Sequence, residues 1–209
     1  DEAAERAAAA ALCDASVVYV SPLTRALQTA QIALAPLLRS RGLPLTLAPN
    51  AREKLNAGGA DTIGIAVGGA EVRARARDFL VPLYDGDEAA VDALVAPPLD
   101  DLEARSRWWS VVPETPEEAA ARVDEVLNQL RHSEHERAIL VGHSHFLREL
   151  FRRHLRPDFA AARPELAAAL QSHKLSNCGV AALEIDFSAA PGDPLVSGAQ
   201  LLFGTRLVP

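Results

Sequence analysis

The chain has 209 residues, of which 49% are hydrophobic and 23% charged, a composition typical of a globular domain with a substantial core. A formal net charge of −7 argues against general nucleic-acid binding but leaves room for a local basic pocket. No apolar run is long enough to span a membrane, and two cysteines imply no disulfide framework, so we expect an intracellular protein, cytoplasmic or organellar.

The first strand–helix pair dominates the early part of the chain. An Ala-rich helix is expected over residues 2–13, followed by four β-formers at 17–20 that predict a short buried strand. Ser21 is a good N-cap and Pro22 a good first helical residue, so a helix is expected at once, running to Ser40 and ending at Arg41-Gly42. Its expected apolar face, spaced by four and three, is Leu23, Leu27, Ala30, Leu34 and Leu37. Arg25 then falls in the first turn of this helix.

Further short strands and helices alternate along the rest of the chain, with a glycine-rich irregular loop expected at 51–70. This alternation predicts a three-layer α/β/α domain with a mostly parallel central sheet. The expected strands are 45–47, 138–142, 179–187 and 200–206, and the expected helices are 71–83, 87–95, 116–130, 146–154 and 159–172.

Two strand ends carry side chains suited to an anion. Arg25 follows the first strand, where a guanidinium beside unpaired backbone N–H groups at a helix N-terminus favours phosphate. His143 follows the strand at 138–142 in the same position, and open α/β sheets bind ligands at the carboxyl ends of their strands. We therefore expect Arg25 and His143 to converge on one anion. A surface salt bridge for Arg25 and a structural role for His143 are the alternatives.

These segments resemble a known family. Ser-Pro-Leu-Thr-Arg-Ala-Leu-Gln-Thr-Ala (21–30) and Val-Gly-His-Ser-His-Phe-Leu (141–147) are similar to two signature segments of the histidine phosphatase, or phosphoglycerate-mutase-like, superfamily. The similarity continues through Leu-Ser-Asn-Cys-Gly-Val (175–180). The resemblance implies a phosphoglycerate-mutase-like fold and the cleavage or transfer of a phosphomonoester through a phosphohistidine.

The resemblance also implies roles for individual residues. Arg25, His143 and Ser144 are expected to bind the phosphoryl oxygens, with His143 stabilising charge as the group transfers. Glu53 matches the family's acidic residue, which protonates the departing alkoxide; its cationic neighbours could instead make it a solvated ion pair. The lesser candidates are Arg52, His145 and Asn177.

The family's Arg-His-Gly motif, which contains the nucleophilic histidine, does not occur in these 209 residues. The sequence contains no Met and begins at Asp1, so we expect that residues preceding it were removed or are not included. The expected organisation is a single domain over 1–209 that lacks its N-terminal strand, with a lid-like insertion at 51–116. Because a parallel sheet without an inner strand leaves buried edges unpaired, that strand would come from upstream residues, another chain or a rearrangement.

An alternative function is a catalytically inactive family member that serves as a scaffold or as a subunit of a larger complex. A second alternative takes Ser144 as the nucleophile of a hydrolase, because residues 142–146 begin like the G-x-S-x-G elbow. Phe146 stands where that turn needs glycine, which disfavours this hypothesis, although His173 could still serve as its base.

The expected binding partner is a phosphorylated small molecule or a phosphoprotein, and no nucleic acid is expected. A homo-oligomer or a protein complex is a further expectation. We expect no metal and no cofactor. The histidine pairs His143-x-His145 and His132-x-x-His135 have no acidic or cysteine partner at ligand spacing.

Overall fold

A computed structural model describes residues 6, 9, 10, 12–54, 69–105, 108, 112–190 and 192–209. The chain divides into two compact units, which are treated separately below. Unit 1 comprises Asp1–Leu12, Pro116–Ser133 and Ser144–Pro209, and unit 2 comprises Cys13–Thr115 and Glu134–His143.

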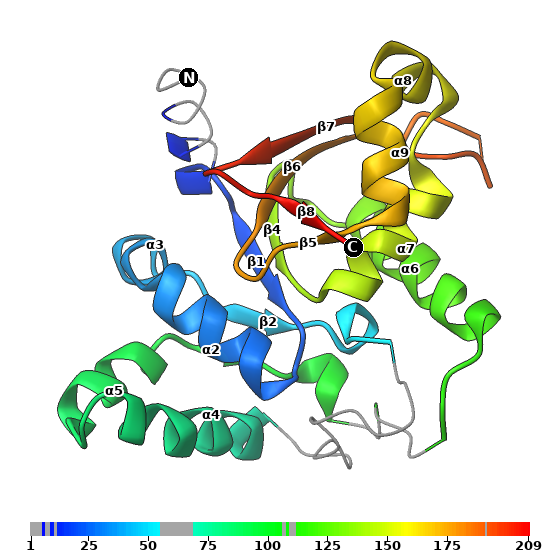
Figure 1. Cartoon of the computed structure of the whole chain (residues 1–209). Coiled ribbons are helices and arrows are strands. Elements are labelled where there is room, and N and C mark those ends of the chain that lie inside the picture. The colour runs from blue at the N-terminus through cyan, green and yellow to red at the C-terminus, as the bar shows by residue number, and fades with distance from the viewer. Residues whose placement is uncertain are drawn as a thin grey trace. The chain divides into compact units, whose positions relative to one another are not determined.

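Unit 2 is built on a four-stranded sheet in the order β3-β2-β1-β4, in which every neighbouring pair is parallel. Figure 1 labels three of these strands, β1, β2 and β4. Val18 of β1 is in register with Leu45 of β2 on one side and with Ile139 of β4 on the other. The predicted α/β class with a parallel sheet is confirmed, while the three-layer arrangement stays a prediction. The strands are β1 (Val17–Val20), β2 (Leu45–Leu47), β3 (Leu99–Asp100) and β4 (Ala138–Val141).

Strand β1 has a hydrogen-bonded neighbour on each edge, β2 and β4. Neither edge of β1 is therefore left unpaired, while the expectation that the domain lacks its N-terminal strand stays a prediction. The ladder even continues past the strand ends, since the backbone N–H of Ser21 donates to the carbonyl of Val141 at 2.9 Å. The direct β1–β4 pairing brings two distant sequence segments together within unit 2.

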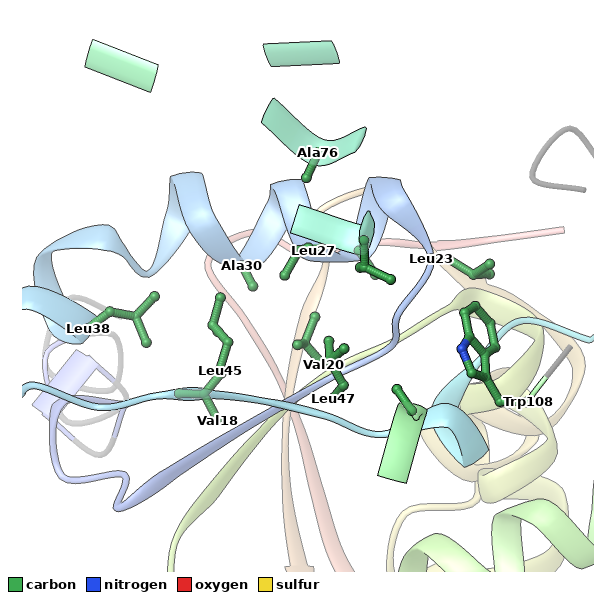
Figure 2. Packing of buried hydrophobic residues seen from close by; sticks show 13 residues of the cluster. Val18, Val20, Leu23, Leu27, Ala30, Leu38, Leu45, Leu47, Ala76 and Trp108 are labelled. Atoms are coloured by element: carbon green, nitrogen blue, oxygen red, sulfur yellow. The ribbon is translucent and has the colours of Figure 1, made fainter. Parts of the chain in front are cut away.

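The core of unit 2 lies between this sheet and the helix that follows β1 (Figure 2). Val18 and Val20 of β1 and Leu45 and Leu47 of β2 are almost completely buried, as β-branched and leucine side chains of an internal parallel strand should be. Figure 2 shows Leu27 facing these strand side chains. Trp108 belongs to the same cluster.

The helix expected from Pro22 to Ser40 is two helices. Helix α2 (Thr24–Ala33) ends at Leu34, and α3 (Ala35–Arg41) begins with Pro36 in its first turn. A proline has no N–H to donate, so it fits the start of a new helix but not the interior of a long one. The break turns Leu38 rather than Leu37 into the core, while Gly42, in the left-handed region with φ 62°, ends α3 as expected.

The helices predicted at 71–83 and 87–95 agree closely with the structure, whereas β3 and two short helices of unit 2 were not predicted. The stretch predicted as a lid-like insertion contains α4 (Gly69–Leu83) and α5 (Glu88–Val95), which pack together around Leu80 and Val91. The irregular loop predicted at 51–70 lies mostly outside the described residues, but residue 51 closes the short helix η1 (Pro49–Ala51) and α4 begins at Gly69. A second short helix is η2 (Leu102–Ala104). A lid function for 51–116 stays a prediction.

Unit 1 combines helices with two antiparallel strand pairs, β6–β7 and β5–β8. The strand predicted at 200–206 is wrong in its bounds, because the chain turns at Phe203 and Gly204, both with positive φ, directly after β7. The helix predicted at 159–172 is divided at Arg163, with Pro164 starting its second part. The elements are α6 (Pro116–Arg131), α7 (Ser144–His154), α8 (Pro157–Ala162), α9 (Pro164–Ser172), β5 (Lys174–Leu175), β6 (Val180–Ile185), β7 (Val196–Leu202) and β8 (Leu207–Val208).

Of the Ala-rich stretch 2–13, the described residues 6, 9, 10, 12 and 13 are helical. Both cysteines, Cys13 and Cys178, are exposed and free. Among the helices of the described ranges, none combines the length and the apolar character that crossing a membrane requires.

Candidate functional site

Three predicted site residues follow adjacent parallel strands of unit 2. His143 comes two residues after β4, Arg25 follows β1 as the second residue of α2, and Glu53 follows β2 and η1. Because the sheet is parallel, the carboxyl ends of β4, β1 and β2 lie at the same edge. The backbone therefore brings these three residues to the edge where α/β sheets bind ligands.

His143 is buried and bonded to a residue at the end of the neighbouring strand. Its Nε2 lies 2.8 Å from Oγ of Ser21, and the two residues are 5% and 0% exposed, respectively. The parallel register of β1 with β4 places them side by side. Ser21 Oγ also accepts a hydrogen bond from the backbone N–H of Leu23 at 3.3 Å. The predicted N-cap is thus wrong: Leu23 is the N-cap of α2, and the Ser21 side chain bonds His143 instead.

Arg25 lies in the first turn of α2, as predicted, where no acidic residue offsets the positive end of the helix dipole. It is an exposed residue, yet partial burial of the guanidinium lowers its pKa, and attraction to the Glu53 carboxylate opposes this effect. An arginine keeps its positive charge whichever of these two effects is larger. The attraction means that Arg25 and Glu53 lie close enough to interact. A cation and a carboxylate therefore occupy one neighbourhood of unit 2.

Glu53 is half-buried, and its carboxylate accepts the backbone N–H of Lys54 at 2.9 Å. The preceding residue, Arg52, anchors this segment: its Nη1 donates to the carbonyl of Pro49 at 3.1 Å and its Nη2 lies 3.4 Å from Oε1 of Glu114. The Glu114 side chain is only 6% exposed. An ion pair thus ties the segment before Glu53 to a part of the chain some sixty residues away.

The other candidates lie in unit 1. Ser144 is the first residue of α7, and His145 receives a hydrogen bond from Arg148 at 2.9 Å on the same helix. Asn177 is exposed in a turn. Ser144, His145 and Asn177 therefore gain no further support as anion ligands from contacts within their own unit.

The hydrogen bonds of unit 1 disfavour one alternative, a Ser144 nucleophile with His173 as its base. Among the contacts described for unit 1, no hydrogen bond joins Ser144 to His173; Nδ1 of His173 bonds Oγ of Ser172 instead, at 2.8 Å. In this described part of the chain, His173 is therefore not bonded to Ser144 as a base would be. Within the described residues, no cluster of three or more His, Cys, Asp or Glu side chains could hold a metal ion.

Two residues with evident roles near the site were not among the predicted ones. Ser21 was expected only to cap a helix, and its bond to His143 depends on the unexpected β1–β4 pairing. The residues around Glu114 do not indicate that it forms an ion pair, because its partner, Arg52, is distant in sequence. The chain was also compared with protein-family models, with curated proteins and with solved structures, and none of them matches it.

Proposed function

We propose that this chain binds the phosphoryl group of a phosphomonoester and belongs to a protein of the histidine phosphatase, phosphoglycerate-mutase-like type. Arg25 and His143 hold the phosphoryl oxygens and Glu53 is the proton donor; a phosphate-binding role for Ser144 stays a prediction. The supporting observation is the placement of His143, Arg25 and Glu53 at the carboxyl ends of three adjacent parallel strands. The three-layer phosphoglycerate-mutase-like arrangement is part of the same proposal.

Each proposed role has a chemical reason. The Arg25 guanidinium keeps its positive charge and can bind two phosphoryl oxygens at once. A carboxyl group protonates the departing alkoxide, and the half-buried Glu53, which interacts with Arg25, is the residue proposed for this step. Such fixed charges act most strongly as charge develops in the transition state.

Turnover also needs a nucleophile. No histidine precedes His132 in the sequence, and none stands in an Arg-His-Gly context. We therefore expect the 209 residues alone to show no turnover of a generic aryl phosphate above background. Clear activity that is lost in His143→Ala alone would mean that the chain already contains a sufficient catalytic apparatus, and the proposed roles would then be wrong.

A second candidate is a non-catalytic phosphoryl-binding protein, a scaffold or subunit. One observation favours it: β1 already pairs with β2 and β4, so a further strand carrying a nucleophile could not enter beside β1 without displacing one of them. The two candidates share the same anion site. They differ in whether the bound phosphomonoester is cleaved.

The test of the shared site is orthophosphate binding, measured by isothermal titration calorimetry on the 209-residue chain. Arg25→Ala should weaken binding roughly 10- to 100-fold, because a hydrogen bond to a charged group contributes about 1.5–3 kcal/mol. Arg39→Ala is the matched control, since Arg39 is an exposed arginine in the last turn of α3, which leads to the amino end of β2 rather than to a carboxyl end of the sheet. Equal affinities of wild type and both variants would refute the proposed anion site.

If residues upstream supply Arg-His-Gly, the full-length protein tests the catalytic roles. Arg25→Ala should then lower kcat/KM by about a hundredfold or more, on the order of 3 kcal/mol. Glu53→Gln should impair substrates with poor leaving groups far more than activated aryl phosphates, which need no proton. Equal losses on both substrates would remove Glu53 from the acid role, and inactivation by a chelator would reject the phosphohistidine mechanism.

A further inference from the structure

The hydroxyl group of Ser21 has few possible hydrogen-bond partners. The side chain is completely buried, and a hydroxyl carries one hydrogen to donate and two lone pairs to accept with. Oγ accepts the backbone N–H of Leu23 at 3.3 Å and lies 2.8 Å from Nε2 of His143. Among the described residues, Ser21 makes no other side-chain hydrogen bond.

The hydrogen bonds of Ser21 indicate which ring nitrogen of neutral His143 carries the proton. If Nε2 carried the ring proton, Oγ of Ser21 would accept from both Leu23 and His143, and its own hydrogen would be buried without an acceptor. Leaving a buried donor unsatisfied is unfavourable, so this arrangement is disfavoured. If Nε2 is unprotonated, the Ser21 hydroxyl donates to it while accepting from Leu23, and both Oγ and Nε2 are satisfied.

We propose that Ser21 is a positioning residue that holds neutral His143 in the tautomer with the ring proton on Nδ1. The hydroxyl occupies Nε2, so Nε2 cannot serve an incoming ligand. Nδ1–H is then the one ring donor that neutral His143 can offer. The segment that ends β1 thus supplies both the cation of the proposed site, Arg25, and the group that sets the proton of its histidine.

A consequence for ligand binding rests on the proposed function. If His143 holds a phosphoryl oxygen while neutral, Nδ1 makes the bond, and loss of the Ser21 hydroxyl frees the ring to change tautomer. Ser21→Ala should then weaken orthophosphate binding roughly 3- to 10-fold, the effect of one neutral hydrogen bond. The tautomer itself is independent of any ligand and can be measured first.

The experiment is a long-range 1H–15N correlation spectrum of the 15N-labelled chain, recorded over a series of pH values and compared where the His143 ring nitrogens give the signals of neutral imidazole. The His143 ring signals are identified by their loss in His143→Gln. The expected spectrum has a pyrrole-type signal at Nδ1 and a pyridine-type signal at Nε2. The opposite pattern in the wild-type protein would overturn the proposal, and this result needs no variant that must fold.

Variants then test whether Ser21 is the cause. Ser21→Ala should shift the His143 signals toward the other tautomer, whereas Ser21→Thr, which keeps a hydroxyl, should restore the wild-type pattern. Ser16→Ala is the matched control, because Oγ of Ser16 lies 3.0 Å from Nδ1 of His135 in an exposed Ser–His pair of the same unit. An unchanged His143 tautomer in folded Ser21→Ala would overturn the inference.

Orthophosphate addition to the same samples keeps the two proposals distinguishable. A wild-type protein with the predicted tautomer but no response to orthophosphate would support the role of Ser21 and count against the proposed function. A response to orthophosphate together with the Nε2–H tautomer would support the proposed anion site and count against the role of Ser21.

Discussion

The ion pair between Arg52 and Glu114 gives the sharpest energetic prediction. The charged atoms lie 3.4 Å apart, and the side chains are 19% and 6% exposed, respectively. The gross attraction at this distance is about 5 kcal/mol at an effective dielectric constant of about 20 and about 1 kcal/mol at that of water. Desolvation of the buried carboxylate offsets much of it. We expect a net coupling of about 1–2 kcal/mol.

The measurement is a double-mutant cycle with Arg52→Gln, Glu114→Gln and the double variant, because the cycle isolates the pairwise energy from the other contacts of each residue. Unfolding in urea can be followed by tryptophan fluorescence, since Trp108 is buried in the core of unit 2. The matched control is the pair Arg75–Glu71, which has the same separation of 3.4 Å but is 32% and 54% exposed.

The control pair should show a coupling of about 0.5 kcal/mol or less, as exposed pairs one helical turn apart do. Equal couplings in the two cycles would refute the argument that burial strengthens the Arg52–Glu114 bond. A large coupling would also mean that the segment carrying Glu53 is held by Glu114, since Arg52 immediately precedes Glu53.

Two further predictions concern stability. Leu27→Ala removes a completely buried side chain and should lower the free energy of unfolding by about 2–5 kcal/mol, whereas Ile32→Ala on the same helix, 44% exposed, should cost less than about 1 kcal/mol; equal losses in urea titrations would contradict the described core. Partial burial raises the pKa of the Asp124 carboxyl, but hydrogen bonds from Arg153 and His154 outweigh it and hold that pKa below its usual value. A carboxyl with a lowered folded-state pKa stabilises the protein at neutral pH and loses this contribution as the pH falls below about 4. Asp124→Asn should therefore reduce the loss of stability between about pH 5 and pH 3 measured by circular dichroism, and an unchanged pH dependence would contradict this role.

Local patterns of the sequence predicted much of the fold. The strand at 17–20 and the helix end at Gly42 follow from β-branched residues and from a glycine that tolerates positive φ, so they needed no tertiary information. The break at Leu34 was not predicted, because the apolar residues on either side of it are spaced as in one continuous helix. Pro36 was the local signal for the start of a second helix. Local periodicity does not reveal where a helix stops and another begins.

The candidate site was predicted in its residues but not in its contacts. Arg25 in the first turn of a helix and His143 at a strand end follow from local signals. The bond between Ser21 and His143 and the pair Arg52–Glu114 do not, because each joins residues far apart in the sequence. Such contacts depend on which strands become neighbours, and the order of strands in a sheet cannot be predicted from the residues of any one segment.

The neighbours of β1 also have a consequence for how the chain folds. Val18 pairs with Leu45 across a short connection, but with Ile139 only after a loop on the order of 120 residues has closed. Closing the longer loop costs about 1.3 kcal/mol more entropy, so we expect β1 and β2 to associate early and β4 to join late. Until then, one edge of β1 lacks its partner and is available for intermolecular pairing. His143 reaches Ser21 only in that last step, so the histidine end of the proposed site would be the last part of unit 2 to acquire its native geometry.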